Sequence, residues 1–143
     1  MSEPKNVLLV TNSTTDSEIL LIKDAMAHAK EQKIEIKLSL VHVIPSLPTC
    51  YFSIPSMVIL AERYYEEATH TLNSISESLG VAKRDQWLIN GRIKTEVSRL
   101  ASKLKTDFIL ASSTSMQDLH QSFLFSRKVN STPIRSISSL ISM

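Results

Sequence analysis

The chain has 143 residues, 43% of them hydrophobic and 21% charged, which suits one globular domain with a sizeable core. Its formal net charge is only +2, and lysine and arginine are scattered among aspartate and glutamate, so no basic surface for nucleic acid or membrane stands out. A single cysteine, Cys50, excludes an intramolecular disulfide, and the four dispersed histidines give no metal-ligand spacing. We therefore expect a single domain over residues 1–143 without a bound metal.

The first third of the chain alternates strand and helix patterns. Residues 6–12 (NVLLVTN) are a near-continuous apolar run, which is typical of a strand buried on both faces of a parallel sheet. Thr15 and Glu18 have the spacing of a capping box, so a helix should start there. Residues 33–44 predict a second strand, and three prolines mark residues 45–55 as a loop.

The middle of the chain contains the firmest helix pattern. Apolar residues step by four and three between residues 56 and 79, which predicts a long amphipathic helix that ends at Gly80. Residues 85–90 (DQWLIN) predict a short strand, Gly91 a turn, and residues 92–105 a further helix with one apolar stripe.

The last third predicts a strand over residues 107–112, a shorter and less regular helix over residues 117–130, and a final strand over residues 132–142. Alternating strands and helices imply right-handed crossovers and a parallel sheet covered by helices on both faces. The predicted fold class is therefore α/β, with a doubly wound, five-stranded parallel sheet.

Glycine is scarce in this sequence. Gly80 and Gly91 are the only two glycines, whereas a dinucleotide fingerprint needs three and a P-loop needs two, because the backbone must approach phosphate without a Cβ in the way. Both of these nucleotide-binding motifs are therefore excluded.

Three side chains raise the question of catalysis. His42 lies in an apolar strand, which favours a packed, hydrogen-bonded core histidine over a general base. His120 and Ser122 could belong to a small α/β hydrolase, which stays open as a third hypothesis. They are two residues apart on one predicted helix, so they would face different directions, and no elbow turn presents the serine.

The loop cysteine and the aromatic residues have ordinary structural interpretations. No cluster of basic residues lies near Cys50 in the sequence, which favours an unreactive side chain. Tyr64, Tyr65 and Trp87 are interpreted as core or rim packing, because the chain is only 6% aromatic and lacks the interleaved basic residues of a base-stacking platform.

Several local patterns, in their order and spacing, together resemble the universal stress protein family over nearly the whole chain. The second strand ends in Leu-Val-His-Val, and a glycine followed by a helix leads into Asp-Phe-Ile-Leu. The resemblance implies strand order 3-2-1-4-5 and an adenine nucleotide alpha hydrolase-like fold. The matching positions are Leu40, Val41, His42, Val43, Gly91, Ile93, Val97, Ala101, Asp107, Phe108, Ile109 and Leu110.

The same resemblance implies where a nucleotide would bind, at the carboxyl ends of the strands. The family's adenine-side aspartate falls on Asn12, and a backbone contact from the second strand falls on Val43. The first two glycines of its phosphate loop fall on Ser112 and Ser115, and its terminal Gly-Ser falls near Ser122. The degenerate cleft so implied comprises Thr11, Asn12, Val43, Ala111, Ser112, Ser115 and Ser122.

Every expected glycine of the phosphate loop is replaced by a residue with a Cβ, which narrows the backbone conformations that a nest of N–H groups needs. We therefore expect no tight ATP binding and no cofactor, as in the branch of the family that lacks the glycine motif. The alternative is an ATP-binding stress sensor with a glycine-free phosphate loop.

The final strand, TPIRSISSLIS, carries little charge and is expected at a sheet edge, where it can pair with another chain. The resemblance implies a homodimer through this strand, and we expect Ile134 and Ile137 near the two-fold axis. The first apolar run is too short for a secretory signal and no stretch reaches transmembrane length, so a cytoplasmic location is expected. The expected protein is a non-catalytic universal stress protein that binds an unidentified protein partner or ligand.

Overall fold

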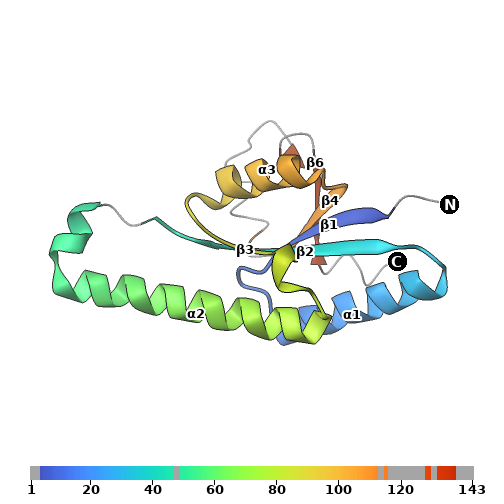
Figure 1. Cartoon of the computed structure of the whole chain (residues 1–143), viewed down its shortest axis with the longest axis horizontal. Helices are drawn as coiled ribbons and strands as arrows, with labels where there is room; N and C mark the ends of the chain where they lie inside the picture. Colours follow the sequence, from blue (N-terminus) through green and yellow to red (C-terminus); the bar gives the residue numbers. More distant parts are fainter. Residues whose placement is uncertain (1–3, 47–48, 113–114, 116–127, 130–131, 138–143) are drawn as a thin grey trace.

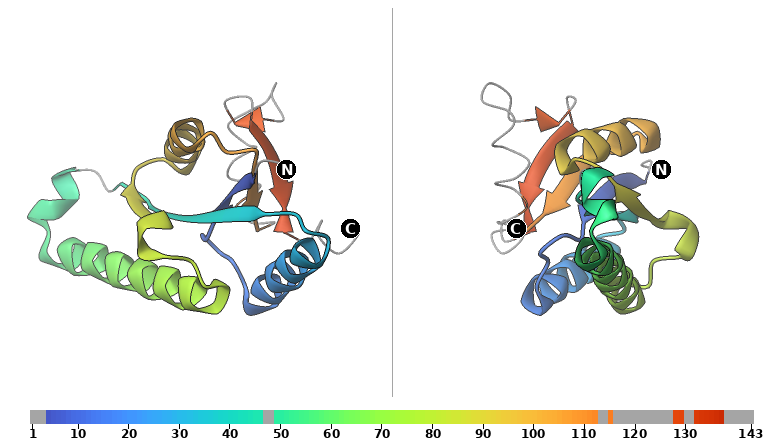
Figure 2. Two further views of the ribbon diagram at one scale, coloured as in Figure 1. Left: turned by 45° about the vertical axis from the view of Figure 1, so that its right-hand side comes forward. Right: turned by 90° about the vertical axis from the view of Figure 1, so that its left-hand side faces the viewer.

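The computed structural model describes residues 4–46, 49–112, 115, 128–129 and 132–137. A parallel sheet lies between two helical layers, with α1 and α2 on one face and α3 on the other (Figures 1 and 2). The elements in chain order are β1 Lys5–Val10, α1 Asp16–Glu31, β2 Ile36–Ile44, the 3-10 helix η1 Thr49–Ser53, α2 Pro55–Leu79, the 3-10 helix η2 Lys83–Asp85, β3 Gln86–Asn90, α3 Ile93–Leu104, β4 Phe108–Ala111, β5 Lys128–Val129 and β6 Thr132–Ser136.

The sheet confirms the predicted fold class. Its parallel strands follow the order β3-β2-β1-β4-β6, which is the order 3-2-1-4-5 when the five parallel strands are counted along the chain. The strand β1 is central, because it pairs with β2 on one side and with β4 on the other. The carboxyl ends of these three strands therefore meet at one edge.

The strand β1 is apolar along its length because both of its faces are buried. Leu8 and Val10 pack in the core beneath α3, together with Val97 of that helix. Val7 and Leu9 pack in the opposite core, with residues of α1 and α2. The continuous apolar run thus reflects two cores separated by one sheet.

The helix α1 begins as the sequence predicts. Thr15 is the N-cap, its hydroxyl oxygen accepts from the backbone N–H of Glu18, and the Glu18 carboxylate accepts from the backbone N–H of Thr15. The predicted capping box is confirmed.

The region after β4 departs from the prediction. Residues 128–130 were expected in a helix, but Lys128 and Val129 form the short strand β5, which pairs antiparallel with Pro133 and Thr132 of β6. Pairing with the start of β6 supplies backbone hydrogen-bond partners there, which outweighs the helical preference of a weakly periodic segment. The rest of that predicted helix, residues 117–127, lies outside the described residues.

The helix α2 is longer than the sheet edge that it covers. Its buried residues, from Ala68 to Ser76, all lie in its second half. At about 1.5 Å per residue, its 25 residues carry its first turns and η1 past the carboxyl ends of β2 and β3 (Figure 1). No helix among the described residues is long and apolar enough to cross a membrane.

Gly91 ends β3 in a backbone conformation that favours glycine. Its φ is +153°, and its N–H donates to the carbonyl oxygen of Ile44 at 3.0 Å. A Cβ built at this position would lie 2.7 Å from Cγ of Glu96. Both backbone conformation and space therefore oppose a side chain here.

We expect Gly91→Ala to lower the free energy of unfolding by about 2 to 3 kcal/mol, measured by urea denaturation. The matched control is Gly80→Ala, whose φ is +68° and whose Cβ would meet no atom within 4 Å, so it should cost only about 1 kcal/mol. Adding Glu96→Ala to Gly91→Ala should recover the stability lost through the clash with the Glu96 side chain. The stability lost through the unfavourable backbone conformation should remain lost. Equal effects of the two glycine substitutions would contradict this account.

Candidate functional site

The described part of the predicted cleft does come together at the carboxyl edge of the sheet. Thr11 and Asn12 follow β1, and Val43 lies near the end of β2. Ala111 ends β4, and Ser112 follows it. These strands are neighbours, so residues 31 and 100 positions apart in the chain are in contact. Ser115 joins them, whereas Ser122 and His120 lie outside the described residues.

The carboxamide of Asn12 is paired with the backbone of Val43. Its Nδ2 donates to the Val43 carbonyl oxygen at 2.8 Å, and its Oδ1 accepts from the Val43 N–H at 2.9 Å. A single side chain therefore uses both the donor and the acceptor of Val43, the residue to which the family resemblance assigns a backbone contact with the nucleotide.

The serine hydroxyls of the predicted phosphate loop are directed inward. Oγ of Ser115 donates to the backbone carbonyl of Asn12 at 2.6 Å, and Oγ of Ser112 donates to the same carbonyl at 3.3 Å. The backbone N–H of Ser115 donates to Oγ of Ser112 at 3.2 Å. Ser112 and Ser115 are 2% and 1% exposed, so these hydroxyls join the end of β4 to the end of β1 and are withdrawn from solvent.

Thr11 and His42 lie in contact next to the Asn12–Val43 pair. The Thr11 hydroxyl donates to the Val41 carbonyl oxygen at 3.2 Å and lies 2.8 Å from Nδ1 of His42. The hydroxyl has one proton, so when it donates to the Val41 carbonyl oxygen the Nδ1–H of His42 donates to the Thr11 oxygen. The predicted hydrogen bonding of His42 is confirmed, although its side chain is only partly buried and borders a pocket. Burial lowers its pKa below 6.5.

Lowered basicity of His42 predicts a loss of stability in acid. The unfolded chain binds a proton at this histidine below pH 6.5 while the folded chain resists it, so the free energy of unfolding should fall as the pH drops below 6.5. His42→Gln should flatten this part of a stability profile measured by urea denaturation. His70→Gln, at an exposed position of α2, should leave the slope unchanged.

A second variant tests whether the burial of His42 or the nearby charge of Glu67 causes the lowered pKa of His42. Glu67 lines the same pocket as His42, and Glu67→Gln should preserve the slope because desolvation is the cause of the shift. An unchanged slope in His42→Gln would show that this histidine does not cause the acid sensitivity.

An open pocket of about 210 Å³ lies between this edge and α2. Asn12, His42 and Val43 form its sheet side, and Tyr64 and Glu67 of α2 face them. In the described part of the chain, no three histidine, cysteine, aspartate or glutamate side chains gather as a metal site. On its sheet side, the polar side chains of Asn12 and His42 are already hydrogen-bonded within the protein.

Other residues singled out from the sequence lie apart from this cleft. Cys50 is an exposed free thiol in η1. Ile134 is half-buried against the core beneath α3, and Ile137 is fully buried in the opposite core. In this single chain Ile137 therefore contributes to the core, and the predicted dimer interface around it stays a prediction.

Tyr64 and Tyr65 were interpreted as core or rim packing, yet 38% and 56% of their surfaces are exposed. They line a second pocket with Phe52 and Asn90, neither of which was predicted as a site residue. Asn90 ends β3. Ligands in this fold class bind at the carboxyl ends of the strands, so a polar residue at that position was the sequence signal that could have indicated this pocket.

Comparison with solved structures identifies the fold. A universal stress protein family structure from Burkholderia pseudomallei has a TM-score of 0.59 at 17% identity, over 91% of this chain and 93% of that one. The hypothetical protein MJ0577 has a TM-score of 0.63 at 18% identity, with 92% and 94% covered. A universal stress protein family protein from Arabidopsis thaliana, with AMP bound, has a TM-score of 0.53 at 20% identity, with 93% and 90% covered.

No protein-family model matches the sequence, and no curated protein matches it. The resemblance inferred from the sequence is thus confirmed by structure: the chain has the α/β fold of the universal stress proteins.

Proposed function

We propose that this protein is a universal stress protein that acts without catalysis, by binding a partner or ligand, and that it does not bind ATP tightly. The observation that carries this proposal is the pairing of Asn12 with Val43. A nucleotide that used the Val43 backbone would first have to displace two hydrogen bonds of 2.8 and 2.9 Å. Displacing them leaves the carboxamide to find new partners, which reduces the net gain from the ligand.

The inward serines support the same proposal at the phosphate end. Phosphate loops bind anions through outward N–H groups and hydroxyls. Here the Ser115 N–H and both serine hydroxyls are engaged within the protein, and both side chains are buried. A phosphate contact through these groups would require this loop to rearrange.

The alternative is an ATP-binding sensor of the same family. The AMP bound to the similar Arabidopsis thaliana protein and the pocket of about 210 Å³ beside Asn12 favour this candidate. It requires the Asn12 carboxamide to give up its hydrogen bonds to the Val43 backbone and to form hydrogen bonds with the nucleotide.

Titration calorimetry of the nucleotide-stripped chain with Mg²⁺ and ATP distinguishes the two. We expect no binding tighter than about 100 μM, which corresponds to about −5.5 kcal/mol. Tighter binding that is lost in Asn12→Ala but kept in Asn6→Ala would overturn the proposal and support the sensor. Asn6 is a matched control because it lies at the other end of β1, where its Nδ2 donates to the Lys105 carbonyl oxygen at 3.4 Å.

The proposal also includes a cytoplasmic homodimer formed through β6, with an unidentified protein as partner. The pairs that β5 makes with β6 reach only Thr132 and Pro133. This supports Ile134 and Arg135 of β6 as residues that pair with a second chain. Because Ile137 is buried in one chain, Ile134 and the strand backbone would supply most of the contact.

We expect the purified chain to sediment as a dimer at micromolar concentration. Ile134→Lys should shift it toward the monomer, because a charge beside the two-fold axis would face its own copy. Ile59→Lys controls for the added charge alone, since Ile59 is 57% exposed on α2, whereas Ile134 also packs against the core beneath α3. A wild-type monomer at this concentration would contradict the dimer.

A further inference from the structure

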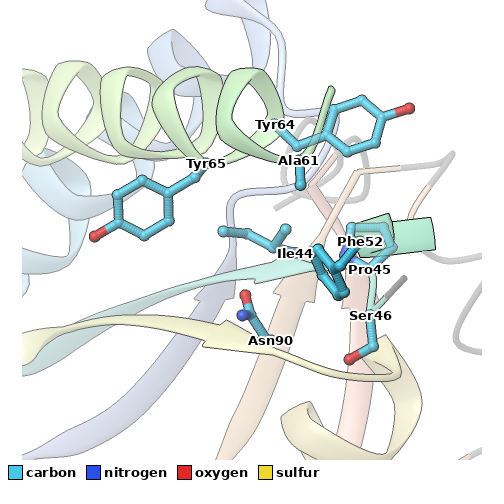
Figure 3. Close-up of a pocket in the computed structure, with 8 residues that line it drawn as sticks. All are labelled: Ile44, Pro45, Ser46, Phe52, Ala61, Tyr64, Tyr65 and Asn90. Carbon is cyan, nitrogen blue, oxygen red and sulfur yellow. The ribbon is translucent and has the colours of Figure 1, made fainter. Parts of the chain in front are cut away.

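A second pocket, of about 240 Å³, lies beyond the carboxyl ends of β2 and β3, beneath the first half of α2 (Figure 3). It is distinct from the Asn12 cleft, because neither Asn12, His42 nor Val43 lines it. Its lining residues are Ile44, Pro45, Ser46, Phe52, Ala61, Tyr64, Tyr65 and Asn90.

The pocket exists because α2 is longer than the sheet. The buried residues of α2 begin only at Ala68, so the preceding turns extend past the sheet, and η1 lies at their end (Figure 1). The short side chain of Ala61 faces Ile44 across the pocket and leaves the space between them open (Figure 3). The helix thus forms a wall of the pocket and leaves it unfilled.

Aromatic side chains surround this space and remain accessible. Phe52 and Tyr65 are 51% and 56% exposed, and Tyr64 is 38% exposed. Tyr64 and Tyr65 leave α2 in different directions on either side of Ala61, whereas Phe52 approaches from η1 beside Pro45 (Figure 3). Exposed aromatic surface grouped around one hollow is typical of a ligand site, because planar rings bind each other by offset stacking and edge contacts.

Asn90 supplies the polar group that can orient a ligand. Its carboxamide is directed from β3 toward Ile44 (Figure 3) and makes no hydrogen bond with any residue that the structure describes. The backbone beside it is already satisfied, because the Gly91 N–H donates to the Ile44 carbonyl oxygen at 3.0 Å. A free carboxamide offers one acceptor and two donors, so it can pair with an amide edge in two directions.

The lining also restricts the charge and size of a ligand. Among the residues that the structure describes, none that lines this pocket carries a charge, so an ionised ligand would lose hydration without gaining a counter-ion there. A volume of about 240 Å³ is below the usual range for drug-sized ligands, and it suits one or two fused rings.

We propose that this pocket binds a small uncharged aromatic compound whose amide-like edge pairs with the carboxamide of Asn90 while its ring packs among Phe52, Tyr64 and Tyr65. This goes beyond the proposed function, because it concerns a different pocket and holds whether or not ATP binds at Asn12. The two pockets share Ile44, Pro45 and Tyr64, so the test must distinguish them.

The test is a nitrogen–proton NMR titration of the full chain with benzamide, a neutral ring that carries a carboxamide. We expect the side-chain amide of Asn90 and the backbone amides of Phe52 and Tyr65 to shift, with a dissociation constant of about 1 mM or tighter. Benzoate has the same ring with a negative charge, and it should bind at least about tenfold more weakly.

Two pairs of variants isolate the contacts. Asn90→Ala should weaken benzamide binding about tenfold, whereas Asn73→Ala, at an exposed asparagine outside the pocket, should not. Tyr65→Ala should weaken benzamide and benzoate together, whereas Ile59→Ala, at an exposed apolar residue outside the pocket, should weaken neither. All four positions are exposed, so the variants should keep the folded spectrum.

Three outcomes would overturn the proposal. One is the absence of any shift up to the solubility limit of benzamide, and another is unchanged affinity in Asn90→Ala. The third is a set of shifts centred on Asn12 and His42, which would place the ring in the neighbouring cleft. None of these depends on the calorimetric result with ATP, so the failure of one proposal leaves the other to be judged separately.

Discussion

Asn12 holds the carboxyl edge of the sheet together. Its carboxamide is bonded to the backbone of Val43 in β2, and its carbonyl oxygen accepts hydrogen bonds from Ser112 and Ser115 beyond β4. One residue thus connects the ends of three neighbouring strands. The orientation of the serine hydroxyls, the state of the Val43 backbone and the shape of the pocket beside His42 all depend on it.

This arrangement follows from the cost of leaving buried polar groups unpaired. An orphaned backbone or hydroxyl group costs about 1 to 3 kcal/mol, and in the described residues no buried side-chain nitrogen or oxygen lacks a partner. A nucleotide cleft must keep such groups available until its ligand arrives. Here the protein satisfies them itself, so a ligand would compete with internal hydrogen bonds rather than with water.

The sequence was sufficient to predict the elements whose signals are local. The apolar run of β1, the capping box at Thr15 and the stripe of α2 each arise within a few turns or strand residues, and the alternation of strands and helices predicts a parallel sheet. The strand order came from the family resemblance, and the sheet confirms it. The short strand β5 could not be predicted, because its two residues have no pattern of their own and take their conformation from pairing with β6.

The sequence predicted where the candidate site lies, but not that its polar groups are hydrogen-bonded to one another. The resemblance to a family indicated Asn12, Val43 and the serines, and the structure brings them together. Their mutual hydrogen bonds span 31 to 103 residues, so no local pattern encodes them. The second pocket was missed for a related reason: whether Tyr65 packs or stays exposed depends on how far α2 extends past the sheet, which is a tertiary property.

Asn12 and Asn90 show how position decides the role of one residue type. Both lie at the ends of strands that flank β2, one after β1 and one in β3 opposite Ile44. Asn12 reaches the Val43 N–H and carbonyl, and its carboxamide is fully used. Next to Asn90, the Ile44 carbonyl already accepts from Gly91. The same edge therefore has an already paired carboxamide beside the central pocket and an available carboxamide near its side, so we look for ligand recognition first in the pocket beneath the first half of α2.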